Sequence, residues 1–148
     1  MSAMTDGFEN SLMLLLFNNT AIANIGDATG LTATGAAGST QIALSSATLV
    51  DADTLLTATE LAYTGYARPT QARSSGGWTV AGAVASNAAI ITFGEMTAGG
   101  PVTAVHSGLG FISTGNVLRL HAALTANLVI NNGINPQFAI SGLTWTAA

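Results

Sequence analysis

The first apolar residues of the chain recur with helical spacing. Four of them stand at intervals of four, three and one residues, which places them on one face of a helix: Phe8, Leu12, Leu15 and Leu16. Asp6 precedes this run and Glu9 follows three residues later, as in a capping box. Other apolar residues fill the remaining directions of the last two turns, so this end is apolar nearly all round. We predict a helix over residues 6–18, enclosed by the core of its own domain or by a neighbouring subunit.

A tract rich in glycine, alanine and threonine follows over residues 26–40, and we expect it to be a loop or arm. From residue 41 onward, short β-prone runs alternate with turn residues. Strands are expected over residues 40–45, 61–73, 78–83, 87–93, 102–109, 117–124, 127–130 and 138–146. This pattern predicts a mainly β fold, an antiparallel β-sandwich of jelly-roll-like type with one N-terminal α-helix. We expect a single domain over residues 1–148, with the sandwich in residues 41–148.

Alternation is clearest in residues 117–124. Leu118, Leu120, Ala122 and Leu124 share one face of the expected strand, and the residues between them share the other. We expect the leucine face to pack inward.

Residues 60–80 contain both tyrosines, the first tryptophan and two of the three arginines. If residues 61–73 form one strand, Tyr63 and Arg73 share a face, and the second tyrosine and Arg68 share the other. Pro69 cannot donate a ladder hydrogen bond, which indicates a sheet edge. Arginine and tyrosine are enriched at interface hot spots, so this segment is interpreted as a docking surface. With the helix it supplies the candidate interface residues Phe8, Leu12, Leu16, Tyr66, Arg68 and Arg73. We expect Arg73→Ala to weaken assembly and not folding.

Charged residues are scarce. They make up 7% of the chain, with no lysine, against about 25% in an ordinary soluble domain. A surface of small neutral side chains exposes weakly apolar patches, which permanent assembly would cover. Three arginines and a net charge of −4 argue against a nucleic-acid partner. The longest apolar run is too short to span a membrane, and without cysteine there are neither disulfides nor thiolate metal sites.

Residues that could carry chemistry are few. Asp51 and Asp53 form the one close carboxylate pair, but a calcium loop needs more oxygen ligands. His106 and His121 lack the third ligand of a zinc site, so each is expected to make a hydrogen bond on a sheet face or at a subunit contact. Glu60 is interpreted as an isolated loop carboxylate. We therefore expect no enzymatic activity, no catalytic residues, no cofactor, no metal and no small-molecule ligand.

Five blocks, in order along nearly the whole chain, carry a resemblance to a known family. They read FENSLMLLLFNNTA, ELAYTGYARPTQARSSGGWTV, SNAAIITFGEM, TAVHSGLGF and NNGINPQFAISGLTWT. These blocks resemble a family of small β-rich virion proteins of tailed bacteriophages. Its members are often labelled tail-fibre-like, and similar small β-rich proteins serve as head decoration, or cement, proteins, commonly as trimers. The resemblance implies a virion component.

Of the two placements, the sequence favours a cement protein that binds and stabilises the assembled head lattice, because a fibre is expected to show repeats or a coiled-coil shaft. The alternative is a tail-fibre or receptor-binding component. The partners expected for a cement protein are the major capsid protein and copies of the chain itself, as a homotrimer. The protein would be made in the host cytoplasm and would lie on the virion, at the head surface rather than the tail.

Overall fold

The computed structural model describes residues 4–26, 30–57, 59–111 and 116–147. The chain divides into two compact units. Unit 1 comprises Met1–Ser39, Gln71–Ile90 and Ala139–Ala148, and unit 2 comprises Thr40–Thr70 and Ile91–Phe138. The single domain expected over residues 1–148 stays a prediction. Within the described residues, no helix has the length and apolar character needed to cross a bilayer.

Unit 1 begins with the helix α1 (Asp6–Asn18). Its N-cap is Thr5, with extended backbone and no side-chain capping bond, so the capping box expected from Asp6 and Glu9 is wrong. Asn19 ends the helix in the left-handed conformation, at φ 54°, as asparagine commonly does. The side chain of Asn19 also holds the arm, because its Nδ2 donates to the Thr34 carbonyl at 2.9 Å and its Oδ1 accepts from the Thr34 amide at 3.0 Å.

The helix packs on a three-stranded antiparallel sheet in unit 1. The strand order is β3-β4-β9, with β3 (Trp78–Ala81), β4 (Val84–Asn87) and β9 (Thr144–Thr146). The helix residues that this packing buries are Met13 and Phe17. The Phe17 ring meets Trp78 edge-on, with ring centroids 4.8 Å apart. The inward face expected to contain Phe8 and Leu12 is therefore wrong within the chain, because the opposite side of the helix, with Met13 and Phe17, packs on the sheet.

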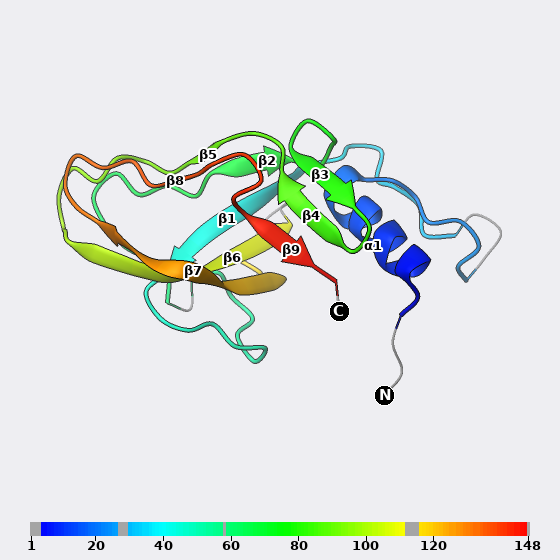
Figure 1. Ribbon diagram of the computed structural model, residues 1–148, viewed down its shortest axis with the longest axis horizontal. Coiled ribbons are helices and arrows are strands. Elements are labelled where there is room, and N and C mark those ends of the chain that lie inside the picture. Colours follow the sequence, from blue (N-terminus) through cyan, green and yellow to red (C-terminus); the bar gives the residue numbers. More distant parts are fainter. Residues whose placement is uncertain (1–3, 27–29, 58, 112–115, 148) are drawn as a thin grey trace. The chain divides into compact units, whose positions relative to one another are not determined.

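A four-stranded sheet has the order β2-β1-β6-β7. Its strands are β1 (Ser39–Ser45), β2 (Thr70–Ala72), β6 (Val102–Phe111) and β7 (Leu120–Ile130). Unit 2 is built around β1, β6 and β7, and of β2 only Thr70 belongs to it. A second antiparallel pair, β5 (Ile91–Thr92) with β8 (Gln137–Phe138), lies across from β1, β6 and β7, so that unit 2 has two layers (Figure 1). Leu118, which precedes β7, is buried while Arg119 is exposed, whereas Leu120, Ala122 and Leu124 within β7 are half-buried. The expected inward face is therefore confirmed at Leu118 alone.

The mainly β, antiparallel class with one N-terminal helix is confirmed (Figure 1). Several strand limits differ from those expected. The strands expected over residues 117–124 and 127–130 are replaced by one strand, β7, over Leu120–Ile130, whereas residues 87–93 and 138–146 each contribute to two strands. The strand expected over residues 61–73 is wrong except at β2, because a turn interrupts it.

Candidate functional site

A turn in unit 2 brings the two tyrosines together. The Tyr66 amide donates to the Tyr63 carbonyl at 3.0 Å, and Gly65 between them has φ +99°, a value that suits glycine. The two rings meet edge-on with centroids 5.2 Å apart. The sequence pattern predicted that the two tyrosines lie on opposite faces of one strand, and this prediction is wrong. We call residues 60–66 the tyrosine loop.

A second loop of unit 2, residues 93–99, holds the tyrosine loop in place. The Thr64 amide donates to the Ala98 carbonyl at 3.0 Å, and the Tyr63 hydroxyl donates to the Gly94 carbonyl at 2.9 Å. Where the two backbones meet, Gly65 faces Gly94, and a Cβ on Gly94 would lie 1.9 Å from the Gly65 carbonyl oxygen. This contact therefore requires glycine.

An ion pair lies at the start of the tyrosine loop. Arg68 donates from Nε and Nη2 to the two oxygens of Glu60, at 2.6 and 2.5 Å, and from Nη1 to Asn116 Oδ1 at 2.7 Å. The two charged side chains are 13% and 14% exposed. The hydrogen bond to Glu60 favours the charged guanidinium and raises the pKa of Arg68. Glu60 is thus a partner of Arg68, and its interpretation as an isolated carboxylate is wrong.

Tyr66 joins the same network. Its hydroxyl accepts from the Leu44 amide of β1 at 3.0 Å, and Glu60 is near enough to influence its pKa. Burial, reinforced by the negative charge of Glu60, raises the pKa of Tyr66. Two predicted interface residues, Tyr66 and Arg68, therefore meet in a polar network that joins the tyrosine loop to the sheet of unit 2.

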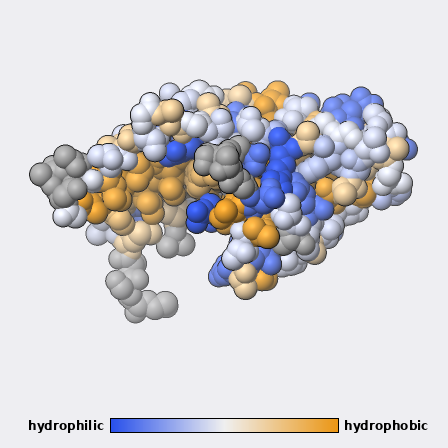
Figure 2. All heavy atoms as spheres, turned by 180° about the vertical axis from the view of Figure 1, so that it is seen from behind, coloured by the Kyte–Doolittle hydropathy of each residue, from blue (hydrophilic) through white to orange (hydrophobic). Residues whose placement is uncertain are grey.

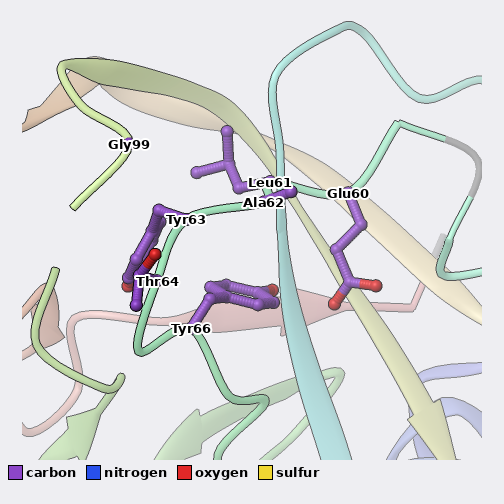
Figure 3. A pocket seen from close by; sticks show the side chains of 7 residues that line it. All are labelled: Glu60, Leu61, Ala62, Tyr63, Thr64, Tyr66 and Gly99. Carbon is purple, nitrogen blue, oxygen red and sulfur yellow. The ribbon is translucent and has the colours of Figure 1, made fainter. Parts of the chain in front are cut away.

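Beside this network the surface has an open depression of about 550 Å³. Its lining residues are Glu60, Leu61, Ala62, Tyr63, Thr64, Tyr66 and Gly99 (Figure 3). The Glu60 and Tyr66 side chains extend to the same side of the loop in this view, and Leu61 extends to the other. The polar groups that line it already have hydrogen-bond partners within the chain: Glu60 accepts from Arg68, the Tyr63 hydroxyl donates to the Gly94 carbonyl, and the Tyr66 hydroxyl accepts from the Leu44 amide.

The other residues considered for chemistry are two aspartates and two histidines. Asp53 accepts from the Val50 amide at 2.8 Å, whereas Asp51 Oδ1 lies 3.1 Å from His121 Nε2. The His121 ring is 6.5 Å from that of His106, centroid to centroid, and the His106 Nδ1 atom is buried without a hydrogen bond to a described residue. The hydrogen bond expected for His121 is confirmed. Among the residues that the structure describes, no three His, Asp or Glu side chains gather as metal ligands would.

Arg73 lies at the other end of the predicted docking segment, in unit 1. It donates to the carbonyls of Leu15 and Leu16 at 2.7 Å each, and to the Ala37 carbonyl at 3.0 Å. These contacts place a cation at the C-terminal end of α1, where the helix dipole is negative. Burial lowers the pKa of Arg73. Arg73 therefore ties the last turn of α1 to the arm.

Replacing Arg73 with alanine is expected to lower the free energy of unfolding by about 1 kcal/mol, because helix-end carbonyls lose a charged donor. This revises the expectation that the change would weaken assembly and leave folding intact. Thermal unfolding followed by tryptophan fluorescence measures it, since Trp78 and Trp145 both lie in unit 1. Arg119→Ala, at an exposed arginine, is the control. An unchanged midpoint for Arg73→Ala would contradict the internal role.

The helix candidates lie on or beside the solvent side of α1. Phe8 is 37% exposed, and Leu12 and Leu16 are half-buried. Figure 2 shows apolar side chains gathered on the surface over α1. The interface role of these residues, and of Tyr66, Arg68 and Arg73, stays a prediction.

The sequence indicated only some of the residues that make these contacts. Glu60, Asn116 and Gly94 were not among the candidates, because the contacts they make join residues 8 to 48 positions apart in loops without periodic spacing. Tyr66 and Arg68 were found from residue type alone.

A model of one protein family matches residues 3–146 of the chain. The family is described as the podophage GP4 fiber I protein gp80. No curated protein matches the sequence. The resemblance to small virion proteins of tailed phages, inferred from the five sequence blocks, is confirmed by this match.

Proposed function

The chain belongs to the family of the podophage GP4 fiber I protein gp80, which makes it a phage structural protein, and we propose that it is a subunit of a tail fibre. The family description is the observation that carries this proposal. In this role the protein acts through contacts with copies of itself and with other virion proteins, and it has no enzymatic function.

The surface chemistry supports a role in assembly. Large apolar side chains are exposed in both units, among them Ile90 and Ile140 in unit 1 and Val129 in unit 2, at 55%, 61% and 55%. With charged residues at 7% of the chain, these side chains lie among small neutral ones. Surfaces of this kind are stable in water when another subunit covers them.

A cement protein on the head is the second candidate. It is favoured by the sequence, which shows neither repeats nor a coiled-coil shaft of the kind expected in a fibre. In that role the major capsid protein would be the partner and the expected homotrimer would bind the assembled lattice. Binding to the lattice more tightly than to its free subunits would stabilise the shell.

Immunogold labelling of intact virions separates the two placements. An antibody raised against the purified chain is applied to particles of the phage that encodes it, and the label is located by negative-stain electron microscopy. We expect gold at the tail. Gold spread over the head would replace the fibre by the cement role. Particles that lack the chain by mass spectrometry would contradict a virion role altogether.

A further inference from the structure

We propose that Asn132 is a site of spontaneous covalent modification, at which the side-chain amide is converted to a carboxylate, and that a contact between Gly133 and Met96 controls the rate. All three residues belong to unit 2. The reaction needs only water, so it does not depend on where the chain lies in the virion. Its test uses purified protein, and either outcome leaves the proposed function untouched.

The first observation is the pair Asn132–Gly133, the one Asn–Gly pair of the chain. In such a pair the glycine nitrogen can attack the carbonyl carbon of the asparagine side chain, because the second residue has no side chain to obstruct the approach. Both residues are exposed, and they form a turn in which Gly133 has φ +83°. A Cβ at Gly133 would have no atom within 4 Å, so nothing crowds the glycine. Within the described residues, the Asn132 side-chain amide has no hydrogen-bond partner that would hold it away.

The reaction has two steps. The Gly133 nitrogen gives its proton to solvent and bonds to Cγ of Asn132, and the side-chain nitrogen takes a proton from water and leaves as ammonia, which closes a cyclic imide. Water then adds to one of the two imide carbonyls and opens the ring. Breaking the new bond to Cγ gives aspartate, whereas breaking the bond to the backbone carbonyl carbon gives isoaspartate. Either product replaces a neutral side chain with a negative charge.

The second observation is a hydrogen bond that restrains the attacking nitrogen. The Gly133 amide donates to the Met96 carbonyl at 2.8 Å, and the Met96 amide donates to the Ile134 carbonyl at 3.0 Å. Met96 is fully buried, so these two bonds hold the turn against the interior of unit 2. While the first bond is made, the Gly133 nitrogen keeps its proton directed at Met96 and cannot turn toward Cγ of Asn132. Attack therefore requires local opening of the turn, which costs less free energy than unfolding the whole unit.

Mass spectrometry of the folded protein tests the site. Trypsin cuts after Arg119, so one peptide, residues 120–148, contains both Asn132 and a matched control, Asn135. Asn135 is also exposed, but it precedes Pro136, whose nitrogen carries no proton to lose. After prolonged incubation at neutral pH, we expect aspartate and isoaspartate at residue 132 and unchanged asparagine at residue 135. In urea-unfolded protein the conversion should be roughly tenfold faster, because the turn is then always open.

Hydrogen exchange tests the control by Met96. The opening that frees the Gly133 nitrogen for attack also exposes its N–H to solvent, so amide exchange at Gly133 and conversion of Asn132 should rise by the same factor as urea is increased below the unfolding transition. An Asn132 that stays intact in the folded protein for many times its half-life in the unfolded chain would overturn the site. Equal rates in the folded and unfolded chains, or a conversion that does not follow exchange at Gly133, would overturn the control by Met96.

Discussion

Replacing Gly94 with alanine is expected to lower the free energy of unfolding by about 3 kcal/mol, the upper end of the cost of overpacking. The added Cβ would lie 1.9 Å from the Gly65 carbonyl oxygen. Because the obstacle is backbone, no side-chain rotation relieves it. The two loops must separate, and the bond from the Tyr63 hydroxyl to the Gly94 carbonyl is lost with them.

Urea titration measures this effect, with each unit followed separately. Both tyrosines lie in unit 2 and both tryptophans in unit 1, so tyrosine absorbance reports the unit that contains Gly94 and tryptophan fluorescence reports the other. Transitions that coincide for the two probes would support one cooperative domain. Transitions that separate would contradict the single domain expected over residues 1–148.

Gly35→Ala is the matched control, because a Cβ there has no atom within 4 Å and the residue has no left-handed φ. Its stability should stay within about 0.5 kcal/mol of wild type, as for an ordinary surface change. Gly65→Ala should be at least as harmful as Gly94→Ala, since Gly65 has φ +99° and its Cβ would lie 2.0 Å from the Glu95 carbonyl oxygen. A Gly94→Ala protein as stable as the control would show that the two loops do not require this close contact.

The same pair of glycines explains why residues 61–69 could not be assigned correctly from sequence. The run of tyrosine, threonine and alanine has β-prone composition, but Gly65 permits a turn whose geometry only the partner loop selects. The helix was easier to predict, because its spacing is local. Its buried side was not, since the last two turns are apolar nearly all round, and contact with Trp78 and the rest of the sheet decides which side is buried.

The candidate site, too, could be predicted from the sequence only in part. Residue type indicated Tyr66, Arg68 and Arg73 as interface candidates, which stays a prediction. Within the chain, Arg68 pairs with the Glu60 carboxylate and Arg73 binds backbone carbonyls. Arginine bound inside a subunit and arginine at an interface have the same appearance in a sequence. Only the fold distinguishes them, because it brings Glu60 to Arg68 and the end of α1 to Arg73.

Replacing Arg68 with alanine is expected to destabilise the protein by about 2 kcal/mol, below the 3–5 kcal/mol typical of a fully buried pair because some exposure remains. The Glu60 carboxylate would lose both of its guanidinium donors and stay largely buried, at 14% exposure. The Tyr66 hydroxyl, which accepts from the Leu44 amide and whose pKa the charge of Glu60 raises, would then lie near an unpaired negative charge.

A double-mutant cycle isolates this interaction. Because the cost comes mainly from the uncompensated carboxylate, Glu60→Gln should recover part of the stability lost in Arg68→Ala. Arg119→Ala, at the exposed arginine, should have little effect. Urea midpoints read by tyrosine absorbance give all four corners of the cycle. If Arg68→Ala and Glu60→Gln simply added, the pair would be independent in solution, and Arg68 would be available for the intersubunit contact that its residue type predicts.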